Sequence, residues 1–195
     1  MNIAFFDFDG TITRQDSLFL FLKFLFGKKV FYWGMLKNLH YLCGYVLGII
    51  NNSRAKERLM RCFMAGINET ELLEKCSDFV LVLEKICRDD AIKRIKWHQD
   101  RGDRVVVVSA TFGCYLGEWC KARGLEYLCT ELESIDGVLS GRFATPNCYG
   151  AQKVARIMQS YRLDSYKEIY AYGDSKGDQE MLQLASKGFY RLFNQ

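Results

Sequence analysis

Three short apolar runs, each ending abruptly in polar residues, constrain the fold of this chain most. They cover residues 3–6, 105–108 and 169–172. A continuous apolar run of this length is typical of a strand buried on both faces. Helical patterns at residues 90–101 and 152–162 precede the second and third runs. Strands that alternate with helices predict an α/β fold with a mostly parallel sheet between helices.

The segment 17–87 interrupts this alternation. It has a helical pattern throughout, and Asn68 or Thr70 is the expected N-cap of a helix over residues 71–87. We interpret 17–87 as an all-helical cap inserted into a catalytic core made of residues 1–16 and 88–195. Further on, the glycine turns within residues 131–142 predict a small hairpin or flap at the edge of the sheet.

Composition limits the classes of function. The 195 residues suffice for one domain with a modest insertion. The net charge of +4 suits an anionic substrate but is too small to indicate nucleic-acid binding, which we do not expect. Residues 2–6 resemble a strand rather than a secretory leader, and the 8 cysteines form no C-x-x-C pair. We therefore expect buried free thiols and a cytoplasmic location.

The polar residues after the three runs carry the candidate chemistry. The carboxyl ends of parallel strands meet at one edge of the sheet, where ligands bind. Asp7 and Asp9 follow the first run, and carboxylates are hard oxygen ligands that suit Mg²⁺. Gly10 allows a tight turn that exposes backbone N–H groups to an anion. Phosphoryl transfer needs such a nucleophile, a divalent cation and donors around the phosphate.

The later segments supply the remaining groups. Ser109 can donate a hydrogen bond to phosphate, and Lys153 near a helix start can neutralise its charge. Asp174 and Asp178 add carboxylates. Each feature alone is more often a solvated turn, a strand end or a surface lysine. Their occurrence in this order, each at a strand end or helix start, indicates a phosphohydrolase.

These motifs resemble those of haloacid dehalogenase (HAD) superfamily phosphatases, close to the phosphoserine-phosphatase-like subfamily IB with a helical C1-type cap. The matching segments are Asp7-Phe8-Asp9-Gly10-Thr11, Ser109-Ala110-Thr111, Lys153 and the segment from Gly173 to Asp178. The resemblance implies a Rossmann-like sheet with an inserted cap. It also favours a phosphatase over a dehalogenase, because dehalogenating members lack an acid at the position of Asp9.

The resemblance further implies individual roles. Asp7 is expected to attack phosphorus and form an aspartyl-phosphate, while Asp9 acts as general acid and then as general base. Mg²⁺ is expected at the Asp7 carboxylate, the Asp9 carbonyl and Asp174, with Asp178 near its water ligands. The expected phosphate ligands are Gly10, Thr11, Ser109, Ala110 and Lys153.

The substrate stays open between a small metabolite such as phosphoserine and a lipid phosphate. Asp16 and Arg54 stand where a phosphoserine phosphatase carries cap residues that bind its substrate, although Asp16 is equally suited to be a helix N-cap. Residues 18–50 combine aromatic and aliphatic residues with lysines. This run suits the packed inner face of the cap or a peripheral membrane contact, and some family members act on phosphatidylglycerophosphate.

A second class of function is a non-catalytic phosphate-binding or interaction protein that keeps the fold. Such a protein is expected to lose Asp9, Lys153 or Asp174, and this chain retains all three. The sequence does not determine the oligomeric state.

Overall fold

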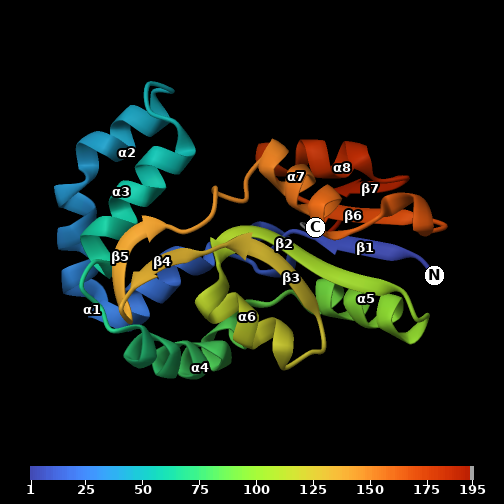
Figure 1. Ribbon diagram of the computed structural model, residues 1–195, viewed down its shortest axis with the longest axis horizontal. Coiled ribbons are helices and arrows are strands. Elements are labelled where there is room, and N and C mark those ends of the chain that lie inside the picture. Colours follow the sequence, from blue (N-terminus) through green and yellow to red (C-terminus); the bar gives the residue numbers. More distant parts are fainter. Residues whose placement is uncertain (194–195) are drawn as a thin grey trace.

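A five-stranded parallel sheet forms the centre of the computed structural model, which describes residues 1–193. The strand order is β3-β2-β1-β6-β7 (Figure 1). The strands are β1 (Ile3–Phe6), β2 (Arg104–Phe112), β3 (Glu126–Thr130), β6 (Ile169–Gly173) and β7 (Lys187–Tyr190). The predicted fold class is therefore confirmed, and the three apolar runs are the three inner strands.

Helices cover both faces of the sheet, which explains why the inner strands are apolar throughout. Ala4 and Phe6 pack on one side with α5 (Asp89–Asp100) and α6 (Gly113–Lys121). Ile3 and Phe5 pack on the other side with α7 (Ala151–Ser160) and α8 (Gln179–Leu184). Successive side chains of a strand point to opposite faces, so each strand contributes to two apolar layers. Three short helical segments complete the core: η1 (Phe8–Ile12), η2 (Leu163–Ser165) and η3 (Lys176–Asp178).

Four helices separate β1 from α5 and lie beyond the carboxyl ends of the strands (Figure 1). They are α1 (Ser17–Lys37), α2 (Leu39–Val46), α3 (Asn52–Met64) and α4 (Glu69–Ile86). Asn68 caps α4 by accepting hydrogen bonds from the amides of Thr70 and Glu71, as expected from the sequence. Within α1, Gly27 adopts a positive φ of 74° and breaks the regular helix. We keep the name cap for these four helices.

The predicted hairpin is present as β4 (Leu132–Ile135) and β5 (Val138–Phe143), which pair antiparallel around Asp136-Gly137. Its two strands are separate from the five-stranded sheet and reach the cap (Figure 1). Leu139 exchanges backbone hydrogen bonds with Gly66 and Ile67, and the Glu69 amide donates to Gly137. The hairpin therefore packs with the cap helices.

Some expectations were wrong in detail. The sequence predicted that the second strand ends before Ser109, but β2 continues to Phe112. Its pairing with β3 shifts register between Val108 and Phe112, so the ladder is interrupted at the polar residues and then resumes. All eight cysteines are free thiols, but Cys43 and Cys62 are exposed rather than buried. Among residues 1–193, no helix combines the length and apolar character needed to cross a bilayer.

Candidate active site

Asp7 lies at the end of the central strand and is almost fully buried. Its amide donates to the Tyr172 carbonyl on β6, a hydrogen bond that fixes the start of the turn after β1. Gly10 has φ of 85°, and a Cβ atom there would lie 2.4 Å from an oxygen of Asp174. Only glycine fits this close approach, which brings the turn after β1 against the end of β6.

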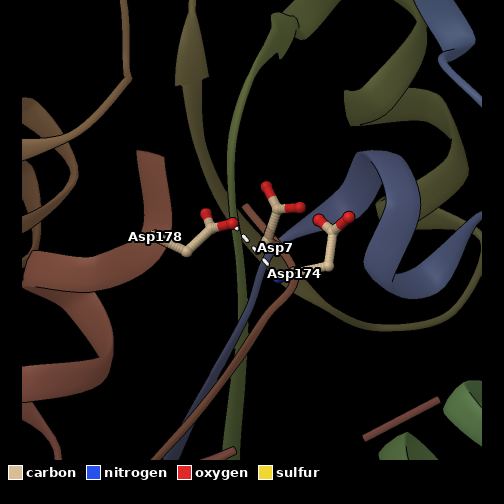
Figure 2. A group of neighbouring side chains, drawn as sticks. All are labelled: Asp7, Asp174 and Asp178. Atoms are coloured by element: carbon tan, nitrogen blue, oxygen red, sulfur yellow. Dashed lines mark hydrogen bonds between the residues drawn. The ribbon is translucent and has the colours of Figure 1, made fainter. Parts of the chain in front are cut away.

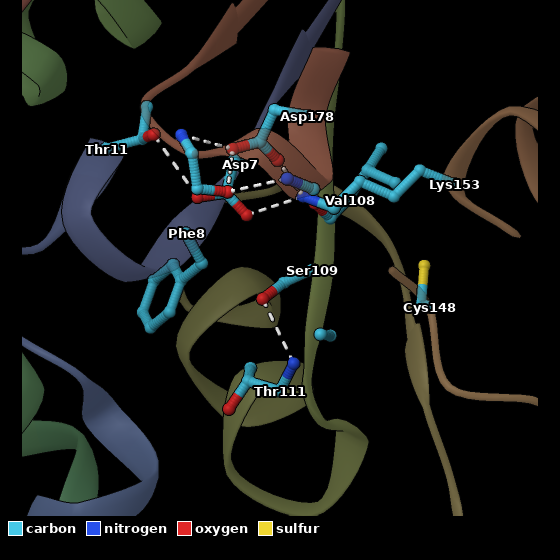
Figure 3. A network of polar contacts seen from close by, with 12 residues as sticks. Asp7, Phe8, Thr11, Val108, Ser109, Thr111, Cys148, Lys153 and Asp178 are labelled. Carbon is cyan, nitrogen blue, oxygen red and sulfur yellow. Dashed lines mark hydrogen bonds and ion pairs between the residues drawn. The ribbon is translucent and has the colours of Figure 1, made fainter. Parts of the chain in front are cut away.

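Lys153 joins the two acidic segments. Its Nζ atom donates to Asp7 Oδ1 at 2.5 Å, to Asp178 Oδ1 at 2.6 Å and to the Val108 carbonyl at 2.7 Å (Figure 3). Burial alone lowers the pKa of a lysine, but the two carboxylates outweigh it and raise the pKa of Lys153 above its usual value. All three donors of the ammonium group are thus used inside the protein.

Asp7, Asp174 and Asp178 form an acidic cluster, with carboxylate oxygens within 4.8 Å of one another (Figure 2). The Thr11 hydroxyl bridges Asp7 and Asp174. Burial and the neighbouring Asp178 carboxylate raise the pKa of Asp174. Grouped carboxylates whose pKa values are raised in this way are stabilised by a divalent cation, and oxygen donors suit Mg²⁺. The residues present therefore fit such an ion.

Asp178 is held more firmly than its partners in the cluster. One carboxylate oxygen accepts from Lys153, and the other accepts from the amides of Asp174 and Ser175 and from the Ser175 hydroxyl. Burial works to raise the pKa of Asp178, but these donors dominate and keep it below its usual value. With both oxygens engaged, Asp178 suits a supporting position beside the ion.

Asp9 is not part of the acidic cluster, and its side chain accepts a hydrogen bond of 2.7 Å from the Ser17 amide at the start of α1. Burial and the nearby Asp16 carboxylate raise the pKa of Asp9 to about 7. A carboxyl group with such a pKa exchanges a proton readily near neutral pH, which suits a general acid and base. Burial also raises the pKa of Asp7, to about 8, against the opposing effect of Lys153.

A pocket of about 340 Å³ opens above Asp7, between the sheet edge and the cap. Ser109 lines it, and the Ser109 hydroxyl accepts from the Thr111 amide (Figure 3). The core contributes mostly polar groups, whereas the cap contributes an apolar wall and one cation, Lys56. The apolar cap residues are Leu18, Phe19, Leu42, Tyr45, Ala55 and Leu59. Pockets of this size take small organic ligands or part of a larger one.

The family model described as haloacid dehalogenase-like hydrolase matches residues 4–183. The chain belongs to this family. Its fold agrees with that assignment, as do the positions of Asp7 and Asp174 directly after β1 and β6, of Ser109 within β2 and of Lys153 in the first turn of α7.

Known proteins resemble this hydrolase over nearly its whole length. Protein CicA of Caulobacter vibrioides is 30% identical over 191 residues, covering 96% of this chain and 85% of CicA. A protein of unknown function from Bordetella pertussis Tohama I has a TM-score of 0.82 at 25% identity, over 95% of this chain and 87% of that one. A phospho-aspartyl intermediate analogue of phosphoserine phosphatase has a TM-score of 0.67 at 18% identity, over 97% and 84% of the two chains. The last likeness concerns the fold.

The structure brings most of the sequence-predicted residues of the hydrolase together, with one exception. Asp7, Asp9, Ser109, Ala110 and Lys153 line the pocket, whereas Asp174, Gly10 and Thr11 lie beside it in the acidic turn. Asp16 has both of its expected features, because it lines the pocket and its carboxylate accepts from the Phe19 amide as N-cap of α1. Arg54 is exposed and does not line the pocket.

Lys56 occupies the place expected for Arg54. Its ammonium group donates to the Ala110 carbonyl at 2.6 Å and lies over the Phe112 ring. Burial lowers the pKa of Lys56 to about 8, although Asp9 and Asp16 oppose this effect. The spacing of Asn52, Lys56 and Leu59 on one face of α3 was a signal available in the sequence. It places position 56, not 54, toward the core.

Proposed function

We propose that this chain is a magnesium-dependent phosphomonoesterase that acts through an aspartyl-phosphate on Asp7. We also infer that it belongs to the phosphoserine-phosphatase-like subfamily, with α1–α4 as a helical cap. The observation that carries the proposal is the buried contact between Lys153 and Asp7 at the base of the pocket, beside the acidic cluster. This geometry supplies a nucleophile whose charge is balanced and whose orientation is fixed.

In the first step, the Asp7 carboxylate attacks phosphorus while the protonated Asp9 carboxyl gives its proton to the leaving alkoxide. In the second step, the Asp9 carboxylate takes a proton from water as the water oxygen attacks phosphorus, which releases inorganic phosphate and restores Asp7. Ser109 is placed to donate a hydrogen bond to a phosphoryl oxygen, and the Lys153 ammonium, whose donors are used by Asp7, Asp178 and Val108, supplies positive charge beside the phosphoryl group. The Asp9 pKa of about 7 populates both of the forms that these steps need.

Asp7, Asp174 and the supporting Asp178 would hold Mg²⁺, together with the Asp9 carbonyl. A bound Mg²⁺ would offset the negative charge that gathers on the carboxylates and on the phosphoryl group. The same positive charge favours the ionised form of Asp7, whose pKa burial otherwise raises. The nucleophile is then available as a carboxylate at neutral pH.

The cap side of the pocket bears on the substrate class. Lys56 supplies a second cation, and Leu18, Leu42 and Leu59 supply apolar contacts. This lining suits a phosphomonoester whose organic part has an apolar portion, either a small metabolite or the end of a lipid phosphate. We propose that Lys56, rather than Arg54, contacts the part of the substrate beyond its phosphate.

Activity toward a panel of phosphomonoesters with Mg²⁺ tests this function. The panel contains phosphoserine, sugar phosphates, nucleoside monophosphates and micellar lipid phosphates. Asp7→Asn should abolish turnover while circular dichroism shows an intact fold. With p-nitrophenyl phosphate, whose leaving group needs no proton, Asp9→Asn should instead accumulate phosphoenzyme, because the amide cannot activate water. Mass spectrometry of the acid-quenched protein should then find the phosphate on Asp7. Substantial Mg²⁺-dependent turnover by Asp7→Asn would disprove the mechanism.

A further inference from the structure

We propose that the outer surface of α1 and α2, with the turn that follows α2, docks on an anionic lipid surface. This docking surface consists of residues 28–49, of which only Leu42 and Tyr45 also line the pocket. Figure 1 shows these helices standing away from the sheet, at the end of the molecule opposite the N-terminus.

Large apolar side chains are concentrated on this surface. Nine of the twenty exposed large apolar side chains that the structure shows in residues 1–193 fall between positions 30 and 49. The most exposed are Val46 at 81%, Ile49 at 77% and Leu47 at 72%, which lie at the last residue of α2 and in the turn that follows it. Trp33 and Tyr32 on α1 are exposed by 60% and 61%. A grouping of this kind on a protein surface marks an interaction site.

The charge of the same segment has a single sign. No Asp or Glu occurs between Asp16 and Glu57, while six Lys or Arg residues do. Since the whole chain carries only +4, the remaining residues are net negative and the positive charge is gathered on this side. Lys28, Lys29 and Lys37 are exposed, and the Lys37 ammonium lies 5.6 Å from the centre of the Trp33 ring.

This combination favours a lipid surface over a protein partner. Protein interfaces are depleted of lysine, and their apolar centre excludes charge. Interfacial helices instead combine aromatic and aliphatic residues with lysines, whose alkyl chains lie along the apolar region while the ammonium groups reach anionic headgroups. Trp and Tyr are the aromatic residues that favour the headgroup level. Charge complementarity thus identifies the occupant as an anionic bilayer surface.

The docking surface is continuous with the wall of the pocket. Leu42 and Tyr45 on α2 line the pocket, and Val46 and Leu47 come next in the chain. A bilayer in contact with the end of α2 therefore lies beside the cap wall that the substrate would touch. This relationship places the pocket near the membrane interface without inserting any catalytic residue into it.

Vesicle flotation tests the proposal with residues 1–195 and two vesicle compositions, phosphatidylcholine alone and phosphatidylcholine mixed with phosphatidylglycerol. The protein should float with the anionic vesicles, float less with the neutral ones and be released by high salt. Lys28→Glu/Lys29→Glu should weaken partitioning by at least about thirtyfold, because each lost lysine contributes roughly fivefold and each new glutamate is repelled by the anionic surface. Val46→Ser/Leu47→Ser should also weaken it, with less dependence on salt.

The matched control is Lys96→Glu/Lys121→Glu, which makes the same charge change at exposed positions on α5 and α6. It should float like the parent protein. The proposal would be overturned if this control lost as much vesicle binding as Lys28→Glu/Lys29→Glu, or if the parent protein did not float with anionic vesicles. Sedimentation velocity provides a further check. A concentration-dependent dimer that Val46→Ser/Leu47→Ser disrupts, without vesicle binding, would show that the surface contacts a second copy of the chain instead.

Discussion

The Lys153 ammonium nitrogen lies 2.5 Å from the Oδ1 oxygen of Asp7, although 146 positions separate the two residues in the sequence. Both side chains are buried, so neither charge is compensated by water. The β1 turn and the start of α7 are therefore coupled electrostatically, and the nucleophile depends on a residue of a different element.

Lys153→Met should reduce both stability and turnover. Removing one partner of a buried ion pair leaves uncompensated carboxylates, which costs about 3–5 kcal/mol. Losing a cation at the phosphate should lower kcat by roughly a hundredfold or more. Urea unfolding and steady-state kinetics measure the two effects, with the exposed Lys85→Met as control. A Lys153→Met variant that unfolds within about 1 kcal/mol of the parent would contradict this account.

Gly10→Ala should raise the Mg²⁺ concentration that the enzyme needs for half-maximal activity. Its loss of stability should be no larger than that of an alanine substitution at another glycine with a positive φ. The added Cβ would displace Asp174, and the positive φ adds strain of about 1–2 kcal/mol. Gly124→Ala is the matched control, because Gly124 also has a positive φ but a Cβ there meets no atom within 4 Å. Both variants should lose similar stability, whereas only Gly10→Ala should need more Mg²⁺ for half-maximal activity. Equal Mg²⁺ requirements would show that the close approach to Asp174 is unimportant.

Lys56 should give kcat/KM a characteristic dependence on pH. Its pKa of about 8 means that the ammonium loses its charge as the pH rises through this value, which weakens the binding of an anionic substrate. Lys56→Arg keeps its charge at high pH, so its kcat/KM should decline later than that of the parent. Lys56→Met should raise KM by about tenfold to a hundredfold at neutral pH. Identical pH profiles for the parent and Lys56→Arg would exclude this role.

His98 should make the protein less stable in mild acid. Its Nδ1 atom donates to the Asp103 carboxylate at 2.8 Å, and its Nε2 atom accepts from the Tyr172 hydroxyl. Burial lowers the pKa of His98 below 6.5, although the bond to Asp103 opposes this shift. As the pH falls, the unfolded chain thus binds the proton before the folded protein does. The contribution of His98 to the stability of the folded protein is therefore complete above about pH 6.5 and declines below it.

Chemical unfolding of the parent protein and His98→Gln across this pH range measures the effect. The variant should be less stable at neutral pH, because it loses the ring and its contacts. The difference in the free energy of unfolding between the parent and His98→Gln should become smaller as the pH falls below about 6.5. A difference in unfolding free energy that grows in acid would mean that the folded protein holds His98 in its charged form.

The sequence predicted the inner strands and the catalytic turns because these obey local rules. Strand β1 is apolar at every position, and Asp136-Gly137 is a typical hairpin turn. The strand β3 was missed because its residues, Glu-Tyr-Leu-Cys-Thr, form no apolar run at the edge of the sheet. Strand β7 (Lys-Gly-Phe-Tyr) lies at the other edge and is mostly exposed. Edge strands owe their structure to pairing with a neighbour, which a local pattern does not contain.

The candidate site shows the same division. Asp7, Lys153 and Asp174 were predicted because they stand at a strand end or helix start, and Ser109 because it follows the apolar run of β2, although the strand continues beyond it. The prediction of Arg54, where the structure has Lys56, depended instead on the rotation of α3 about its axis. Two residues further along a helix, a side chain points to nearly the opposite side. A shift of two positions therefore led to the exposed Arg54 being predicted in place of Lys56, which lines the pocket. The packing of α3 against the core decides that rotation.

The hairpin makes the cap inseparable from the rest of the chain. Leu139 and Gly137 exchange backbone hydrogen bonds with residues 66–69, and a Cβ at Gly141 would lie 2.6 Å from the Arg61 backbone. Residues 132–143 therefore belong spatially with helices that precede them by some seventy positions. Replacing residues 17–86 with a short linker would leave the hairpin with unpaired backbone groups and with apolar side chains exposed to water. Grafting the cap onto another scaffold would accordingly require both pieces to be transplanted together.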